Sequence, residues 1–376
     1  DGISDDDEGT GDSDGDGIPD YLDIDSDNEL VFGTRNGLVY GLDHLGNQLF
    51  SYEQNDSIVG YCLLSDVNND SFFEIVFIAT NDSTSKLHII DYLGNDLEGF
   101  PIIIPKKIIA PAAIADIDMD GYSDIVFGAI DGAVYVIDIS GNIKTGFPIY
   151  ALDGIYSPPT LLNLDDNPEL EIVLNDNNGI IYLYNHNGSL IDQFATGSQL
   201  SSSISVADLN RDGLIELIFS SSDSLLHALT VASETEISNW PISLNGSSIS
   251  ESIIIDLDDN EDLEIITPSY NGYLNIFHHD GSPYHNFPYI SQDTIKSSAS
   301  VGDLDNDGDY ELVFGTNRNL NVLDINEIGG EQYSWKTYRG NSMRNGFYDA
   351  ELSELSNDDF KIPKEYSLEN NYPNPF

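Results

Sequence analysis

A short acidic motif followed by an apolar strand recurs along the chain at nearly constant spacing. The copies are "DIDSDNELVFGT" from Asp23, "DVNNDSFFEIVF" from Asp66, "DIDMDGYSDIVFG" from Asp116, "NLDDNPELEIVL" from Asn163, "DLNRDGLIELIF" from Asp208, "DLDDNEDLEIIT" from Asp256 and "DLDNDGDYELVFG" from Asp303. Successive starts are 43, 50, 47, 45, 48 and 47 residues apart. A period of this length is typical of a unit with four short strands. Seven copies therefore predict seven such units.

The units share one order of elements. A strand of small residues such as "APAAIAD" leads into the acidic loop, and then come an apolar strand ("DIVFG"), a second strand ("GAVYVID"), a turn ("ISGN") and an aromatic-Pro segment. Small residues suit the crowded place where sheets converge on an axis, and proline belongs on an outer edge strand because it cannot donate to a ladder. We therefore predict an all-β protein, a single closed seven-bladed β-propeller of four-stranded blades.

Two details of this propeller can be predicted further. We expect Phe100, Phe147, Trp240 and Phe287, which precede prolines at regular intervals, to pack between neighbouring blades rather than to form an exposed platform for sugars. The first unit lacks an obvious small-residue strand. Either residues 18–22 or residues 345–348 must supply it, and the sequence does not distinguish between them.

Alternating oxygens in these loops predict calcium sites. Side chains at the first, third and fifth positions, a backbone carbonyl at the seventh and an acid at the ninth form a cage of hard oxygens. The helical calcium hand needs a Glu at the twelfth position, where this chain has Phe314 inside a predicted strand. The two most complete predicted ligand sets are Asp116, Asp118, Asp120, Tyr122 and Asp124, and Asp303, Asp305, Asp307, Asp309 and Glu311.

Four other loops match this pattern less closely. Three of them give the predicted sets Asp66, Asn68, Asp70, Phe72 and Glu74, then Asp208, Asn210, Asp212, Leu214 and Glu216, then Asp256, Asp258, Asn260, Asp262 and Glu264. In the loop at Asn163 the first ligand is neutral and Pro168 replaces the glycine, so a metal site and a turn without metal both stay open. For every loop the alternative is a solvated turn that keeps the protein soluble.

The D-x-D-x-D-G-x-x-[DE] loops and the "IVFG" or "LVFG" strands after them resemble the FG-GAP repeats of integrin alpha subunits and the related VCBS-type repeats of secreted bacterial propellers. This resemblance covers nearly all the chain. It implies that calcium loops brace the blades at one face, with ligands in the loops that begin at Asp116 and Asp303. The chain departs from the family pattern by a Glu at the ninth position in most copies and by a missing glycine in three.

The two ends resemble other modules. "DSDGDGIPDYLDIDSDNE" is similar to a thrombospondin type 3 calcium repeat, and its predicted ligands are Asp12, Asp14, Asp16, Ile18, Asp20 and Asp23. "YSLENNYPNPF" resembles the opening of the C-terminal sorting domain of type IX secretion. We expect an acidic calcium-binding or disordered segment at 1–22, the propeller at 23–349, a linker at 350–366 and the start of a sorting domain at 367–376, within an interior fragment of a secreted precursor.

Composition limits the partners. The chain has 13 Lys plus Arg against 66 Asp plus Glu, a formal charge of −53, which argues against nucleic acid or an anionic membrane as a partner. No apolar run approaches the length of a membrane-spanning helix. The single cysteine, Cys62, lies in a leading strand, where a buried inert thiol is expected rather than a nucleophile.

No familiar catalytic motif occurs in the sequence. His44, His186, His278 and His279 fall in turns where other units carry Tyr or Ile, so they are expected to be structural. The preferred function is a non-catalytic, calcium-braced binding or adhesion module, secreted or at the outer cell surface. Its expected partners are an extracellular protein or glycan and the type IX secretion machinery, and the domain is expected to be monomeric.

The alternative is a carbohydrate-active enzyme resembling a polysaccharide lyase. Such an enzyme needs a base and cations near an acidic sugar. Basic residues that could meet such a sugar are scarce: Lys106, Lys107, Lys144, Arg211, Lys296, Arg318, Lys336, Arg339 and Arg344. An enzyme is therefore the less favoured prediction, and the identity of the ligand stays open.

Overall fold

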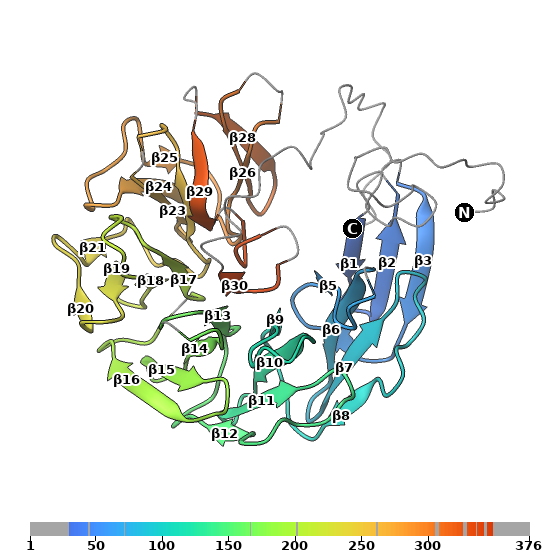
Figure 1. Ribbon diagram of the computed structural model, residues 1–376. Coiled ribbons are helices and arrows are strands. Elements are labelled where there is room, and N and C mark those ends of the chain that lie inside the picture. Colours follow the sequence, from blue (N-terminus) through green and yellow to red (C-terminus); the bar gives the residue numbers. More distant parts are fainter. Residues whose placement is uncertain are drawn as a thin grey trace.

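Seven small sheets follow one another around a common axis (Figure 1). The computed structural model describes residues 30–348 apart from 44–45, 71, 166, 201, 261, 305–307, 326–328, 336 and 342–343. All regular elements in this range are strands, and no helix that could cross a membrane occurs in it. The seven-bladed β-propeller is confirmed. The segments predicted at 1–22, 350–366 and 367–376 lie outside the described residues.

The blades contain three to five strands rather than four throughout. The first is β1 (Leu30–Gly33), β2 (Leu38–Leu42) and β3 (Gln48–Glu53), and the second is β4 (Ser57–Ile58), β5 (Leu63–Ser65), β6 (Glu74–Thr80), β7 (Ser85–Ile90) and β8 (Ile102–Ile104). The third is β9 (Ala113–Ala115), β10 (Asp124–Gly128), β11 (Ala133–Ile137) and β12 (Ile149–Tyr150). The fourth is β13 (Thr160–Leu162), β14 (Glu171–Asn175), β15 (Ile180–Asn185) and β16 (Leu190–Ala195), joined by β30 (Phe347–Tyr348).

The remaining blades follow the same order. The fifth is β17 (Ser205–Ala207), β18 (Glu216–Ser220), β19 (Leu225–Thr230), β20 (Thr235–Glu236) and β21 (Ile242–Ser243). The sixth is β22 (Ile253–Asp256), β23 (Glu264–Pro268), β24 (Tyr273–His278) and β25 (Tyr289–Ile290), joined by β29 (Gly330–Trp335). The seventh is β26 (Ser300–Gly302), β27 (Glu311–Gly315) and β28 (Leu320–Asp324).

In the second to seventh blades the strand after the acidic loop is central, whereas β1 lies at the edge of the first sheet. In the third blade the order is β12-β11-β10-β9, so β10 pairs with the small-residue strand β9 on one side and with β11 on the other. Every residue of β10 is buried. A continuously apolar strand is expected here because neighbouring blades cover both of its faces. The predicted position of the small-residue strand at the inner edge is confirmed.

The aromatic-Pro segments pack between blades, as predicted. Phe100 and Trp240 are 8% and 7% exposed. Phe147 and Phe287 are partly buried against the clusters that join the third blade to the fourth and the sixth to the seventh. The Trp240 indole also donates a hydrogen bond of 3.0 Å to the backbone oxygen of His279 in the next blade. The platform alternative is therefore wrong for these four rings.

Two strands near the end of the described chain, β29 and β30, pair with inner strands of the ring, which was not predicted from the sequence. β29 pairs antiparallel with β22, and β30 pairs parallel with β13. Residues 345–348 therefore add to the fourth blade, so the alternative that placed them in the first blade is wrong. The reason is physical: inner strands are sheet edges with unpaired backbone groups, and an extended segment near the axis can pair with them. The other alternative, residues 18–22, lies outside the described range.

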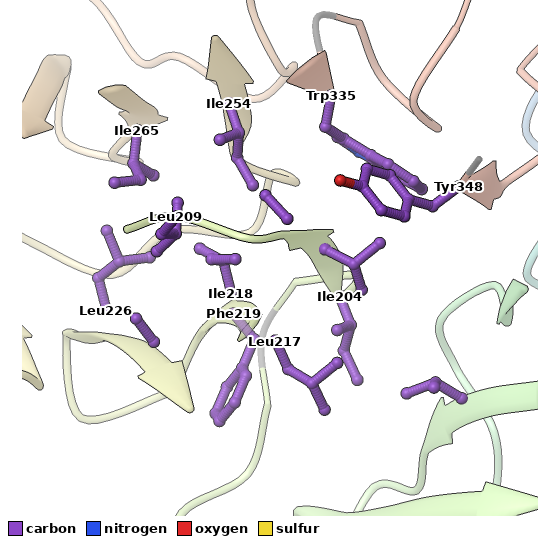
Figure 2. Packing of buried hydrophobic residues seen from close by; sticks show 14 of the residues in the cluster. Ile204, Leu209, Leu217, Ile218, Phe219, Leu226, Ile254, Ile265, Trp335 and Tyr348 are labelled. Atoms are coloured by element: carbon purple, nitrogen blue, oxygen red, sulfur yellow. The ribbon is translucent and has the colours of Figure 1, made fainter. Parts of the chain in front are cut away.

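Hydrophobic clusters join each blade to the next, from the first to the seventh. In the part of the chain that the structure describes, no such cluster joins the seventh blade to the first. The largest cluster spans the fourth to sixth blades and includes Trp335 and Tyr348 from the C-terminal segment (Figure 2). Their rings lie side by side, 6.3 Å apart, next to Ile254 of β22.

The axis itself is occupied by a buried ion pair. Arg339 Nη1 lies 3.4 Å from Glu251 Oε2, and both side chains are fully buried. Glu251 Oε1 also accepts hydrogen bonds from the Trp335 indole (2.6 Å) and from the backbone nitrogen of Arg339 (2.8 Å). The Arg339 guanidinium donates to the backbone oxygen of Pro159 as well. The C-terminal segment is therefore tied to the fourth and sixth blades by polar contacts at the centre.

Candidate metal-binding loops

The acid at the ninth position of each loop is the first residue of a central strand. All six are buried, at 6% exposure or less: Glu74, Asp124, Glu171, Glu216, Glu264 and Glu311. Acidic side chains are almost never fully buried unless they are paired. Their repetition means that each blade from the second to the seventh places one carboxylate under its acidic loop.

The loops bend by left-handed backbone conformations at two positions. The fourth residue has a positive φ in four loops, including 57° at Met119 and 54° at Arg211. Gly121, Gly213 and Gly308 at the sixth position have φ between 84° and 96°. A side chain at the sixth position would be strained at such angles, which explains the glycine in the motif.

Carboxylates within each loop bind its own backbone. Asp116 accepts hydrogen bonds from the backbone nitrogens of Asp120 (3.0 Å) and Gly121 (2.8 Å), and Asp208 does the same for residues 212 and 213. The buried acid accepts from the second residue of its loop: Val67 donates to Glu74 at 3.0 Å, and Leu257 donates to Glu264 at 2.8 Å. A carboxylate oxygen has more than one lone pair, so an oxygen that accepts one of these hydrogen bonds can also coordinate a cation.

Among the residues that the structure describes, three groups of carboxylates lie close enough to hold one ion, with ligand atoms within 4.8 Å of one another. They are Asp116, Asp118 and Asp120; Asp256, Asp258 and Glu264; and Asp309, Glu311 and Asp324. The first two belong to predicted sets. In the third, Asp309 takes part by its side chain, and Asp324 was not predicted although it pairs with Glu311 across β27 and β28. Hard oxygen clusters of this kind suit Ca²⁺.

The other predicted sets differ. Asparagine holds the third position in the loops at Asp66 and Asp208, and its amide nitrogen lies 2.8 Å from Asp70 and 3.1 Å from Asp212. In the loop at Asn163, Glu171 Oε1 is buried and has no hydrogen-bond partner among the described residues. Asp305, Asp307 and the N-terminal set of Asp12, Asp14, Asp16, Ile18, Asp20 and Asp23 lie outside the described range, as does His44.

Burial changes the acidity of these groups. Desolvation raises the pKa of Glu74, Asp124 and Glu216 to about 7 and the pKa of Glu264 to about 8. Nearby loop aspartates add to the shift by repulsion, for example Asp256 and Asp258 at Glu264. A bound cation would act in the opposite direction because it favours the ionised form.

We expect the stability of the calcium-free protein to fall as pH rises from about 5 to 8. The folded state keeps protons on Glu74, Glu216 and Glu264 that the unfolded chain has already lost near its ordinary pKa, so stability present at low pH is lost as pH passes the folded values. Melting temperatures at half-unit pH steps after exhaustive dialysis against chelator would measure this. Glu264→Gln should flatten the slope, and a melting temperature that rises over this range would contradict the prediction.

One loop already contains a cation from the chain. Lys144 Nζ lies 2.7 Å from Asp118, 2.9 Å from Asp124 and 3.5 Å from Asp120. Burial by itself would lower the pKa of Lys144, but the hydrogen bonds to Asp118 and Asp124 outweigh it, so its pKa is raised. The sequence motif predicts a complete calcium set in this loop and does not assign Lys144 to it. The departure of Lys144 from the apolar residues at its place in other units was the available signal.

A second unpredicted arrangement looks catalytic but is structural. Ser221 Oγ lies 3.0 Å from His227 Nε2, and His227 Nδ1 lies 2.5 Å from Glu236. Ser221 is fully buried, and a nucleophile must reach its substrate. His227 stacks on Phe219 as His88 stacks on Phe77 in the second blade, at 4.8 and 4.7 Å between ring centroids. The histidine therefore occupies a repeated packing position.

The remaining predicted residues also lie in structural contacts. His278 Nδ1 lies 2.9 Å from Glu264, and His279 Nδ1 lies 3.5 Å from Asp262. Cys62 is buried, and desolvation raises the pKa of its thiol to about 12, as an inert cysteine requires.

A pocket of about 290 Å³ lies on the face opposite the acidic loops. The two ends of β14 mark the two faces of the ring. Its first residue, Glu171, lies at an acidic loop, and its last residue, Asn175, lines the pocket. Segments that precede inner strands line this pocket, together with Tyr338 from the C-terminal segment. Tyr156 is 51% exposed there, and Ser157 donates to Asn175 at 2.7 Å. An exposed ring beside hydrogen-bonding groups is typical of a ligand site.

Comparisons with known proteins support the fold. No protein-family model matches the sequence, and neither does any curated protein. The solved structure of the V. cholerae biofilm matrix protein Bap1 is similar, with a TM-score of 0.60, 13% identity, and coverage of 90% of this chain and 80% of that chain. At this identity the likeness concerns the fold alone.

Two further solved structures are similar to this chain. The computationally designed Ika8 protein has a TM-score of 0.56 and 17% identity, with coverage of 80% and 81%. BBS1N in complex with ARL6DN has a TM-score of 0.54 and 13% identity, with coverage of 79% of this chain and 87% of that chain. Together with the seven blades, these structures place the chain in the class of β-propellers.

Proposed function

We propose that this protein is a secreted or cell-surface propeller of the FG-GAP/VCBS type, whose acidic loops bind calcium and whose opposite face binds an extracellular ligand. The observation that carries the calcium part is the repeated buried acid, which sits beneath a loop of further carboxylates in six blades. Burying an acid costs free energy unless a partner favours its ionised form. Calcium would be that partner.

The bracing role follows from where the loops lie. Each loop links an inner strand to the central strand of the same blade, so an ion held by Asp256, Asp258 and Glu264 would tie the end of β22 to the start of β23. It would also remove the repulsion between these three carboxylates. Similar ions in several blades would stiffen one face of the ring.

The opposite face suits ligand binding because the acidic loops do not occupy it. Its pocket is lined by Tyr338 of the C-terminal segment and by Ile109 and Ile249, two exposed apolar side chains. The adhesion role is proposed from this exposed pocket, and the likeness to a biofilm matrix protein concerns the fold alone. Under this proposal the N-terminal calcium repeat and the type IX sorting signal serve export and display at the cell surface.

The lyase alternative has less support. Lys144 and Arg339, two of the few basic side chains, are bound to carboxylates inside the protein. The hydrogen-bonded group of Ser221, His227 and Glu236 is also inaccessible to a substrate, because Ser221 is fully buried. The described residues thus offer no base and cation together at the pocket.

We expect Tyr156→Ala to weaken ligand binding at least tenfold, because exposed aromatic rings at the centre of a site often carry much of the binding energy. A glycan and extracellular-protein array, probed with the calcium-loaded protein, would identify the ligand, and titration would measure the loss. Tyr150→Ala is the matched control, since Tyr150 is 62% exposed on the outer strand β12. Equal binding by wild type and Tyr156→Ala would remove the pocket from the proposal, and release of unsaturated oligosaccharides from acidic polysaccharides would establish the lyase instead.

A further inference from the structure

Lys144 occupies the same backbone position as a core residue in three other blades. It lies three residues before Phe147, as Leu97, Ile237 and Tyr284 lie three residues before Phe100, Trp240 and Phe287. In all four blades the backbone nitrogen of this residue donates to a carbonyl of the third strand at 2.9–3.0 Å, for example Lys144 to Val136 and Ile237 to Ala228. The side chains therefore start from equivalent places.

The surroundings of their side chains differ. Leu97, Ile237 and Tyr284 pack in hydrophobic clusters. Lys144 instead extends to the acidic loop, where its side chain is 16% exposed and contacts three aspartates. A lone lysine in the interior is unfavourable, whereas a lysine within hydrogen-bond distance of two carboxylates is compensated.

The acid beneath the loop differs in the same blade. The ninth residue here is Asp124, while the five other loops with this buried acid carry Glu. The longer side chains of Glu74, Glu216 and Glu264 accept a hydrogen bond from the second residue of their loop. Asp124 is one methylene shorter, and Lys144 Nζ lies 2.9 Å from its carboxylate. The shorter acid and the lysine are therefore complementary.

We propose that the Lys144 ammonium group is a built-in counter-ion of the loop at Asp116–Asp124, so that this loop is braced without calcium. This inference rests on the proposed calcium binding by the other loops. The ammonium lies between Asp118, Asp120 and Asp124, where a calcium ion would need the same oxygens. Calcium could enter only by displacing it, and the positive charge would repel the ion. The loop closest to the sequence motif is then the one that needs calcium least.

Calcium titration of the full chain by calorimetry, with wild type, Lys144→Met and Lys144→Arg, tests this inference. Methionine keeps the length of the side chain and removes the charge. We expect Lys144→Met to gain one calcium site, or to bind calcium at this loop at least tenfold more tightly, and Lys144→Arg to behave as wild type. Asp118→Asn added to Lys144→Met should abolish the new site, and Lys106→Met is the control, because Lys106 pairs with Asp131 at the other end of β10.

The outcomes separate this inference from the proposed function. If Asp118→Asn removes a calcium site from wild type, or if Lys144→Met gains none, the counter-ion role is overturned. If wild type binds no calcium but Lys144→Met gains a site, the general calcium proposal fails and the counter-ion role stands. Should Lys144→Met fold poorly, the rise of its melting temperature in 10 mM calcium is compared with the rise in wild type, because a freed site makes the rise larger in the variant and an equal rise overturns the counter-ion role.

Discussion

Calcium should raise the melting temperature of this protein by on the order of 10 °C relative to the chelated protein. One site held at a hundred times its dissociation constant contributes about 2.7 kcal/mol, so two sites contribute about 5 kcal/mol. Oxygen cages in extracellular modules bind calcium at about 0.1–1 mM, and each kcal/mol corresponds to roughly 2–4 °C in a domain of moderate size. The clusters at Asp256 and Asp309 are the first candidates, because their carboxylate oxygens already lie within 4.8 Å of one another.

Melting curves in 10 mM calcium, 10 mM magnesium and chelator would measure this shift. Magnesium is the control ion because it prefers a smaller octahedral site. Asp258→Asn combined with Glu264→Gln should remove part of the calcium shift while stabilising the chelated protein, since it removes the repulsion at the buried acid. Identical curves in calcium and in chelator would disprove the bracing role.

Glu251→Ala should destabilise the protein by about 3–5 kcal/mol, the cost of leaving a buried charge without its partner. Arg339 is fully buried, and Glu251 is its ion-pair partner as well as the acceptor for Trp335 and for the backbone nitrogen of Arg339. The loss should release the C-terminal segment from the axis. Urea unfolding monitored by tryptophan fluorescence reports it, since Trp335 is one of two tryptophans in the chain.

A double variant provides the control for this experiment. Arg339→Met together with Glu251→Leu removes both charges and should recover much of the stability, because well-packed apolar residues often replace a buried ion pair at little cost. A loss below about 1 kcal/mol in Glu251→Ala would mean that the ion pair does not hold the segment in place.

Much of the architecture was readable from local repetition. Each blade repeats one sequence of strand, acidic loop and strand, so a period of about 47 residues predicted seven blades and the order of strands within them. The aromatic-Pro rings, the inner position of "APAAIAD" and the burial of Cys62 followed from residue chemistry that acts within one unit or between neighbours. The carboxylate groups at Asp116 and Asp256 likewise lie within single loops.

The contacts that could not be predicted from the sequence involve residues that depart from the repeat. Lys144 replaces an apolar core residue, and only the position of its ammonium group relative to Asp118 and Asp124 reveals a contact with the loop. Asp324 joins Glu311 through strand register rather than through loop spacing.

The sequence by itself determined the number of blades and the acidic residues of each loop, because these are properties of a single unit that is repeated. Only the tertiary structure decided what fills the axis. Arg339 meets Glu251 across 88 residues, and β30 adds to β13 in the fourth blade rather than to the first. Inner strands from several blades present unpaired backbone edges at the same place, so the partner of the C-terminal segment is set by which edge it can reach in the assembled ring.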